Sequence, residues 1–342
     1  MLRYVCIAMC LFGLVAVPAS AQTMSVGTGP YTPAIVEGDS GVPNHTIYRP
    51  KDLEPFSKKN PMPVLAWGNG GCSSSSSMHA NFLAEVASQG FLVLALGPYR
   101  EPGAGRDAGM MGGGGGTTSA QMLEAIDWAT KENKNKDSKY YEKLNPSLFA
   151  VAGMSCGGIQ ALEVSPDSRV KTTMVMDSGL FGASRGAPGA PGAPGAAAPG
   201  APEAPPAAAP GAPGAPGAGA RGGGARGGGG GMMGMPNLPK EHLQKLHAPV
   251  IYIEGGPSDI AYQNGLDDFA KIEKVPAVFA SYANVGHGGT YSQPNGGEFG
   301  KVAGAWLKWQ LKKDKEAAKM FTGNDCPLCK DEKWEFKKKK ID

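Results

Sequence analysis

The stretch that most constrains the fold is a short apolar segment followed by a serine between glycines. Residues 149–152 are apolar, Gly153-Met154-Ser155-Cys156-Gly157 follows, and residues 158–162 continue with a helical pattern. A strand, a sharp turn and a helix in this order form a nucleophile elbow, which exposes its serine hydroxyl above the carboxyl edge of a parallel sheet. Glycines two residues before and after the serine leave room for neighbouring backbone. The segment predicts a parallel sheet with a reactive serine, Ser155, at its edge.

Other segments of strand or helix length alternate along the chain. The expected strands are 34–36, 44–49, 63–67, 91–96, 170–176, 249–254 and 277–282, and the expected helices are 80–89, 118–129, 267–273 and 298–311. Uninterrupted apolar runs are typical of strands that are buried on both faces. Strands that alternate with helices over short connections form parallel β-α-β units. We therefore expect one α/β domain with a mostly parallel sheet.

Two segments lie outside this expected domain. Residues 1–21 combine Arg3, an uncharged apolar run and an Ala-Ser-Ala cleavage site, which predicts a signal peptide. The mature chain would be periplasmic or secreted, with no membrane anchor after cleavage. Residues 182–235 are rich in Gly, Ala and Pro and cannot bury apolar surface, so we expect a disordered insert between two parts of the domain, 22–181 and 236–342.

The charge balance does not indicate an electrostatic partner. The formal net charge is +3, and removal of Arg3 with the signal peptide leaves +2. The one basic cluster, residues 337–340, favours a solvated C-terminal tail. The glycine-rich residues 103–116 predict a flexible loop. We predict no nucleic-acid partner, and the oligomeric state stays open.

A serine nucleophile needs a base that removes the hydroxyl proton and a carboxylate that orients the base. The sequence has five histidines: His45, His79, His242, His247 and His287. In elbow proteins the base follows the acid along the chain. Only His287 follows the strand after the acid strand, in a glycine-flanked loop at 284–290. We therefore expect His287 to be the base, against the alternative of a surface turn histidine.

The carboxylate is expected on the loop after the strand 249–254. That loop, residues 255–261, carries Asp259. Asp177 is a rival because it ends an earlier strand, although an aspartate that stabilises the strand end is the favoured interpretation there. Glu254 lies within or at the end of its strand and is less suited to reach a loop histidine. Asp259 is the predicted acid.

Acyl transfer also needs two backbone amides that bind the oxyanion. The amide of Cys156, which follows the nucleophile, is the first candidate. The loop Gly68-Asn69-Gly70-Gly71 follows the strand 63–67 and would supply the second donor from Asn69 or Gly70. A plain tight turn is the alternative interpretation of this loop.

On these residues the chain resembles the α/β-hydrolase superfamily and, within it, the branch of dienelactone hydrolases and cutinase-like polyesterases. The resemblance covers most of residues 63–311 and rests on 67–72, 153–158, 255–261 and 286–288. It implies an α/β-hydrolase fold whose mostly parallel central sheet is flanked by helices, with the insert at the position of the cap. The polyesterases usually carry Met where this chain has Cys156. A disordered insert in place of a folded cap implies an open, shallow acyl site.

Four cysteines follow the signal peptide: Cys72, Cys156, Cys326 and Cys329. Export favours disulfides. Cys326 and Cys329 have the spacing of a redox motif but lack a thioredoxin-like context, so we predict a local disulfide. Cys72 and Cys156 lie on the two loops that would supply the oxyanion donors, so a bond between them would rigidify that site.

Together these features predict an exported serine hydrolase that acts on carboxylic esters: small esters, acetylated or feruloylated polysaccharide, or polyester-like substrates. We expect neither a metal nor another cofactor. A dienelactone-type enzyme would carry Cys at the elbow, where this chain has Ser155. A serine peptidase is less favoured because no domain suited to peptide selection is evident. A non-catalytic exported binding or wall-associated module would leave Ser155, Asp259 and His287 in the right order by chance.

Overall fold

The computed structural model describes residues 21–24, 27–100, 116–181 and 235–342. The predicted signal peptide, the glycine-rich loop 103–116 and the insert 182–235 lie outside these residues, apart from the last residue of each. All structural statements below are about the described residues.

A ten-stranded sheet forms the centre of the fold, in the order β1-β2-β3-β5-β4-β6-β7-β8-β9-β10. Six neighbouring strands run parallel: β5 (Leu92–Leu96), β4 (Met62–Gly68), β6 (Leu144–Met154), β7 (Val170–Met176), β8 (Val250–Glu254) and β9 (Ala277–Tyr282). Antiparallel strands flank them: β1 (Gln22–Met24), β2 (Ala34–Glu37), β3 (His45–Pro50) and, at the other edge, β10 (Trp334–Lys339). The predicted α/β class with a mostly parallel sheet is confirmed.

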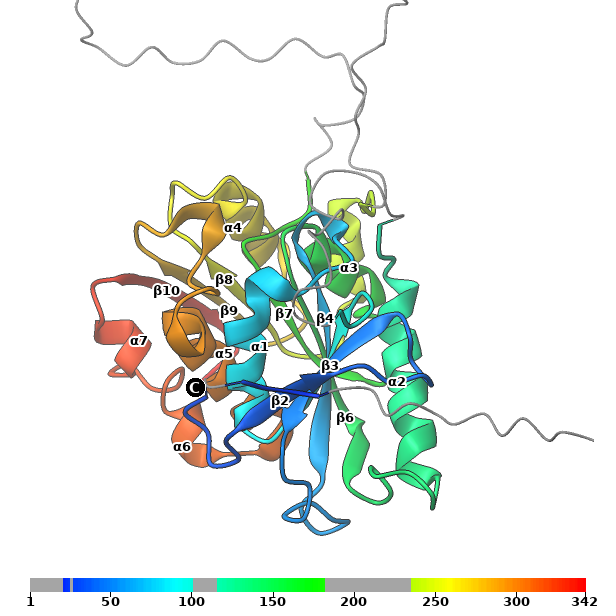
Figure 1. Cartoon of the computed structure of the whole chain (residues 1–342). Coiled ribbons are helices and arrows are strands. Elements are labelled where there is room, and N and C mark those ends of the chain that lie inside the picture. Colours follow the sequence, from blue (N-terminus) through cyan, green and yellow to red (C-terminus); the bar gives the residue numbers. More distant parts are fainter. Residues whose placement is uncertain (1–20, 25–26, 101–115, 182–234) are drawn as a thin grey trace, which may run out of the picture.

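Helices cover both faces of the sheet (Figure 1). Helices α1 (Ala80–Ser88) and α5 (Gly297–Lys312) pack on one face, against alternate residues of the central strands such as Leu65 and Ala150. Helices α2 (Ala120–Lys134), α3 (Cys156–Val164) and α4 (Tyr262–Lys271) pack on the other face, against residues such as Val64 and Val175. Successive side chains along one strand point to opposite faces of the sheet, and a hydrophobic core covers each face. The central strands therefore carry apolar side chains on both faces, which explains the uninterrupted apolar runs.

The remaining elements are short. They are α6 (Lys315–Ala318), α7 (Pro327–Lys330) and the 3₁₀ turns Gly70–Cys72, Ser77–His79, Lys240–Lys245, Gly286–Gly288 and Pro294–Gly296. Among the helices in the described ranges, none combines the length and the apolar character that a membrane crossing needs.

Helix α4 begins five residues earlier than the predicted helix 267–273. Gly265 lies inside it, and glycine normally disfavours a helix interior. A Cβ at Gly265 would lie 2.4 Å from Oε1 of Glu254 and 3.0 Å from the carbonyl oxygen of Ser178. Close packing against Glu254 of β8 therefore requires glycine at this position. Helix propensity alone does not predict this requirement.

The prediction of a solvated tail for residues 337–340 is wrong, because most of them belong to strand β10. Its residues pair with β9 from Trp334 opposite Tyr282 to Lys339 opposite Ala277. The ammonium group of Lys339 donates hydrogen bonds to the carbonyl oxygens of Phe269, Ala270 and Ile272, at the C-terminal end of α4. Lysines on an edge strand also discourage pairing with another chain. Here the charge run protects an edge and caps a helix.

The turn between β6 and α3 depends on close backbone contacts. A Cβ at Gly153 would lie 2.2 Å from the carbonyl carbon of Gly157, and a Cβ at Gly157 would lie 2.1 Å from the carbonyl oxygen of Gly68. Neither atom is the end of a flexible side chain, so the backbone itself would have to move. The expected collision of side chains with the neighbouring strand and helix is confirmed.

We predict that Gly157→Ala destabilises the protein by about 1–3 kcal/mol, the usual cost of forcing extra atoms into a packed interior. Gly304→Ala, in the middle of α5, is the matched control, since its Cβ would meet only Cγ of Gln89 at 3.7 Å. That control should be neutral or should stabilise by up to about 1 kcal/mol through helix propensity. Urea unfolding followed by circular dichroism measures both, and equal stabilities would contradict the packing argument.

Candidate active site

Ser155 sits in a strained turn at the carboxyl end of β6. Its φ is +54° and its ψ is −118°, a conformation that non-glycine residues rarely adopt. Two hydrogen bonds to the end of β7 and the residues after it hold the turn: the Ser155 amide donates to the carbonyl oxygen of Met176 (2.9 Å), and the Ser178 hydroxyl donates to the carbonyl oxygen of Ser155 (2.6 Å). The neighbouring strand therefore holds the backbone in the conformation that exposes the Ser155 side chain.

Two other side chains complete a hydrogen-bonded chain with Ser155. Nε2 of His287 lies 3.0 Å from Oγ of Ser155, and Nδ1 of His287 lies 2.6 Å from Oδ1 of Asp259. His287 comes from the 3₁₀ turn after β9, and Asp259 comes from the loop after β8. Because the carboxyl ends of parallel strands meet at one edge, residues 132 and 28 positions apart come into contact there. The structure thus brings together the three predicted residues.

The carboxyl group of Asp259 is ionised over most of the pH range. Its burial would raise its pKa, but the hydrogen bonds that it accepts from His287 and the Ala261 amide outweigh burial and lower the pKa to about 2. An ionised carboxylate can only accept, so Nδ1 of His287 carries the proton that it donates to Asp259. Nε2 then has a free lone pair that faces the hydroxyl proton of Ser155, which is the arrangement a general base requires.

The other histidines take no part in this hydrogen-bonded chain. His45, His242 and His247 each place Nε2 within 3.1 Å of a backbone carbonyl oxygen, those of Gln121, Leu162 and Val170 respectively. His79 packs against the rings of Trp67 and Tyr291 at 5.2 and 5.0 Å. Burial lowers the pKa of His79 to about 4, so its ring is neutral at neutral pH.

Of the three candidate oxyanion donors, Cys156 and Gly70 lie at the site, and Asn69 lies behind it. Cys156 is the first residue of α3, so its amide has no carbonyl of a preceding helical turn to bind. Gly70 lines the cavity beside Ser155. Asn69 is buried behind this loop, where its side chain accepts from the Trp67 indole and donates to the carbonyl oxygens of Ser73 and Leu96. Of the two alternatives for the second donor, Gly70 lies at the cavity and Asn69 shapes the loop.

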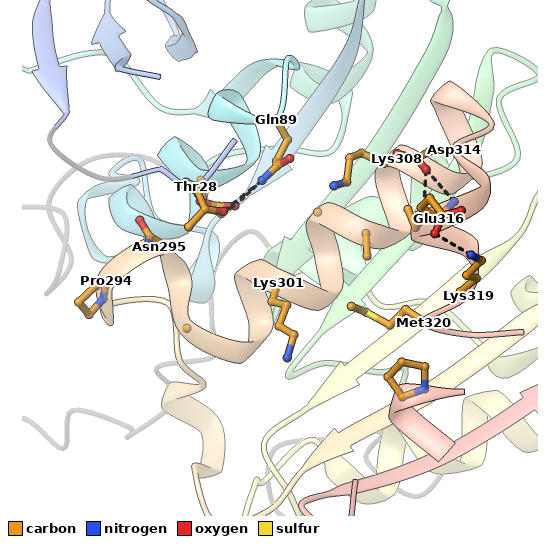
Figure 2. A pocket seen from close by; sticks show the side chains of 16 residues that line it. Thr28, Gln89, Pro294, Asn295, Lys301, Lys308, Asp314, Glu316, Lys319 and Met320 are labelled. Carbon is orange, nitrogen blue, oxygen red and sulfur yellow. Dashed lines mark hydrogen bonds and ion pairs between the residues drawn. The ribbon is translucent and has the colours of Figure 1, made fainter. Parts of the chain in front are cut away.

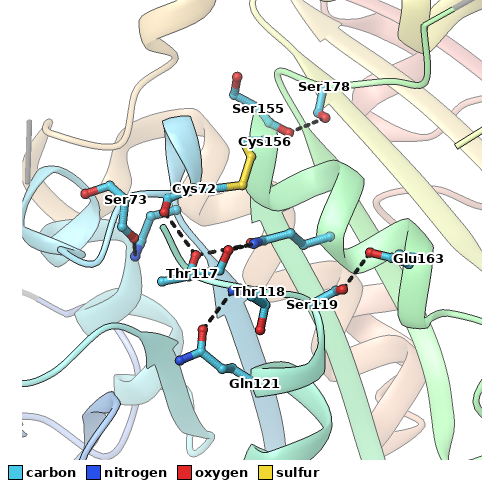
Figure 3. Close-up of a disulfide and its surroundings, with 12 residues drawn as sticks. Cys72, Ser73, Thr117, Thr118, Ser119, Gln121, Ser155, Cys156, Glu163 and Ser178 are labelled. Carbon is cyan, nitrogen blue, oxygen red and sulfur yellow. Dashed lines mark hydrogen bonds between the residues drawn. A yellow bond between two sulfur atoms is a disulfide. The ribbon is translucent and has the colours of Figure 1, made fainter. Parts of the chain in front are cut away.

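Both predicted disulfides are present. Cys72 bonds to Cys156, and Cys326 bonds to Cys329. The first one joins the loop after β4 to the residue that follows Ser155 (Figure 3). Thr117 extends the link, because its amide donates to the carbonyl oxygen of Cys72 (2.9 Å) while Gln160 of α3 donates to the carbonyl oxygen of Thr117 (2.7 Å). The two loops with candidate oxyanion donors are therefore held together covalently.

A cavity of about 490 Å³ opens beside Ser155 and His287. This volume is in the range of small-molecule sites. Its lining combines glycines at Gly70, Gly71 and Gly288 with hydroxyl and apolar side chains from Ser73, Ser75, Ser77, Met78, His79, Met154, Tyr291 and Ser292. The sequence showed the serine run but did not indicate that its side chains line the cavity. Nothing in the sequence indicated that His79 and Tyr291 line it.

No family model matches the sequence, and no curated protein matches it either.

Among the hydrogen bonds of the described residues, Asp177, the rival acid, makes none with His287. Its Oδ2 accepts a hydrogen bond from the Tyr291 hydroxyl at 2.8 Å. Carboxylate oxygens of Asp177, Glu254 and Asp259 nevertheless lie within 4.8 Å of one another, and all three side chains are buried. They are the one set of three potential metal-ligating side chains in the described ranges. Burial, and then the proximity of Asp259, raises the pKa of Asp177 well above its ordinary value.

A second cavity, of about 620 Å³, lies between α1, α5 and α6 (Figure 2). Lys301, Lys308 and Lys319 line it together with Asp314 and Glu316, and Lys319 is paired with Glu316 at 2.7 Å. Its lining includes neither Ser155 nor His287. The second cavity is therefore separate from the candidate site.

We predict that the double variant Cys72→Ala/Cys156→Ala loses roughly 4.5 kcal/mol of unfolding free energy, because the bond closes a loop of 84 residues. Cys326→Ala/Cys329→Ala is the control, with cysteines only 3 positions apart, and should lose less than half of that. Denaturant unfolding measures both losses, and peptide mass mapping without reduction should show both links. A larger loss for the control would contradict the loop-closure argument.

Proposed function

We propose that this protein is an exported serine hydrolase of the α/β-hydrolase type that cleaves carboxylic esters. The observation that carries the proposal is the continuous hydrogen-bonded chain from Ser155 Oγ through His287 to Asp259, at 3.0 and 2.6 Å. The strained turn at Ser155, the order Ser, Asp, His along the chain and the mostly parallel sheet support it.

In the acylation step, Oγ of Ser155 attacks the ester carbonyl carbon while Nε2 of His287 takes the hydroxyl proton. The carboxylate of Asp259 stabilises the imidazolium that forms. The amides of Cys156 and Gly70 donate to the oxyanion. His287 then gives its proton to the alkoxy oxygen, and the alcohol leaves. An acyl-enzyme ester on Ser155 remains.

In the deacylation step, His287 takes a proton from water as the water oxygen attacks the acyl carbon. The tetrahedral intermediate uses the same two amides, and collapse returns the proton from His287 to Ser155 while the acid departs. The Cys72–Cys156 disulfide serves both steps, since it fixes the distance between the loop of Gly70 and the amide of Cys156. Donors that are held in place need no reorganisation during the reaction.

The cavity favours small esters whose alcohol carries further hydroxyl groups, such as acetylated sugars. The loop after β4 presents Ser73, Ser75 and Ser77 to the cavity, while Met154 and Met78 provide apolar surface. Oγ of Ser73 accepts a hydrogen bond from the Ser75 amide at 3.1 Å, and its own proton is directed to no acceptor within the described part of the chain. A hydroxyl group of the substrate would satisfy that donor.

We predict that Ser155→Ala lowers kcat on p-nitrophenyl acetate by about 10³-fold or more without unfolding the protein. The wild-type protein should bind a fluorophosphonate probe covalently at Ser155, and the variant should not. His287→Ala should lose a similar factor. A wild-type protein that remains unlabelled would favour a non-catalytic binding module, and an unchanged rate in Ser155→Ala would place the chemistry at another residue.

We also predict that Ser73→Ala raises KM for acetylated monosaccharides by up to about tenfold, the equivalent of one lost hydrogen bond. Its KM for p-nitrophenyl acetate, whose leaving group offers no comparable hydroxyl donors and acceptors, should stay the same. Ser74→Ala is the matched control, since this neighbouring serine does not line the cavity. Equal effects on the two substrates would remove the hydroxyl argument and leave the ester hydrolase proposal intact.

A further inference from the structure

Three buried carboxyl groups meet behind His287. Asp177 follows β7, Glu254 ends β8 and Asp259 lies on the loop after β8, so adjacent strand ends bring them together. The exposed fractions of Asp177 and Glu254 are both 0%, and that of Asp259 is 4%. One carboxylate is needed to orient His287, and the other two have no role in the reaction as described.

In the described part of the chain, no cationic side chain pairs with Asp177 or Glu254. Among the ion pairs of the described residues, Asp259 has His287 as a partner, while Asp177 and Glu254 take part in none. Burying an unpaired carboxylate costs several kcal/mol or more, and a buried group normally takes up a proton instead. Three negative charges within 4.8 Å would repel each other as well.

The hydrogen bonds distinguish the two oxygens of each carboxyl group. Oδ2 of Asp177 accepts from the Tyr291 hydroxyl at 2.8 Å, and Oε1 of Glu254 accepts from the Ser178 amide at 3.3 Å. Oδ1 of Asp177 and Oε2 of Glu254 are buried and have no donor directed at them. An unprotonated oxygen in such a place would be an unsatisfied acceptor, whereas a protonated one needs only an acceptor.

Asp259 offers that acceptor. Its Oδ1 accepts from His287 at 2.6 Å and from the Ala261 amide at 2.9 Å. Its Oδ2 accepts a single long hydrogen bond, from the Gly255 amide at 3.3 Å, and has capacity for more.

We propose that Asp177 and Glu254 are positioning residues that stay protonated in the folded protein and donate hydrogen bonds to the Asp259 carboxylate, which keeps Oδ1 of Asp259 directed at His287. Burial is the largest cause that raises the pKa of both groups well above the ordinary values, and the proximity of Asp259 adds to it. Of the other titratable groups in the described ranges, Tyr291 donates to Asp177, and Tyr252 is near enough to Glu254 to be affected by its charge. Burial raises the pKa of both tyrosines, so both stay neutral. The cluster then carries one negative charge.

The protonation can be tested without any activity. Asp177 must take up a proton when the protein folds at pH 7, a cost that grows as the pH rises above the ordinary pKa of 3.8. An asparagine takes up none, accepts from Tyr291 and donates to Asp259. Asp177→Asn should therefore have a higher Tm than wild type at pH 7, and the difference should shrink as the pH falls to 4. Glu254→Gln should behave in the same way and serves as the second variant if Asp177→Asn does not fold.

Asp167→Asn is the matched control. Hydrogen bonds from Arg169 lower the pKa of Asp167 to about 2, so this carboxylate contributes stability at pH 7 that is lost as the pH falls towards 2. Its amide variant should have a lower Tm at pH 7, the opposite sign. A lower Tm at pH 7 for both Asp177→Asn and Glu254→Gln would mean ionised carboxylates and would overturn the proposal. So would a fall in the Tm of wild type with EDTA, which would indicate that the three carboxylates hold a divalent cation.

The positioning role rests on the proposed function and needs kinetics. Asp177→Ala removes the donor and should lower kcat on p-nitrophenyl acetate by about tenfold with KM unchanged, as for the loss of a hydrogen bond to a charged group. Asp177→Asn should restore most of kcat, whereas Asp259→Asn should not. Equal losses of kcat in Asp177→Ala and Asp177→Asn would contradict the positioning role. Absence of esterase activity in the wild-type protein would sink the proposed function alone, because the Tm series would still decide the protonation.

Discussion

The close approach of backbone at the turn of Ser155 is the constraint on which the site depends. Gly157 lies against the carbonyl of Gly68, and Gly153 lies against the carbonyl of Gly157, so β4, β6 and the start of α3 are closer than any side chain would allow. This proximity, together with the hydrogen bonds of the Ser155 amide and carbonyl to β7 and the residues after it, holds Ser155 at φ +54°. The strain at one residue is sustained by the packing of three parallel strands and a helix.

The parallel sheet also decides where charge is placed. Adjacent strands end at one edge, and the loops after them carry three carboxyl groups into a region with little solvent. The pKa of Asp259 is lowered, whereas the pKa values of Asp177 and Glu254 are raised. One principle explains both: His287 and neutral donors stabilise one buried negative charge, but a second buried negative charge would have no partner to stabilise it. The proposed chemistry needs that single charge beside His287.

The side of the site that carries the candidate oxyanion donors is organised by a covalent bond instead of by charge. The Cys72–Cys156 disulfide ties the glycine loop after β4 to the first residue of α3, and Thr117 joins that link to α3 through Gln160. The cavity beside it takes its polar lining from the serines of the same loop. Rigid candidate donors and a hydroxyl-lined wall on one loop are what the proposed cleavage of a small polar ester requires.

The sequence by itself determined the α/β class and strands such as β7 and β9, because uninterrupted apolar runs are local signals. It also singled out Ser155, Asp259 and His287 as candidate site residues and four cysteines as possible disulfide partners, but the contacts among them depend on the fold. It did not determine the roles of Gly265, Lys339 or Tyr291. Those depend on contacts between elements: a helix glycine pressed against Glu254, a lysine that caps α4 from the edge strand, and a tyrosine bonded to Asp177. Only the tertiary structure decided that Asp259 contacts His287 while Asp177 and Glu254 lie behind it, since burial and hydrogen-bond geometry have no signature in a linear sequence.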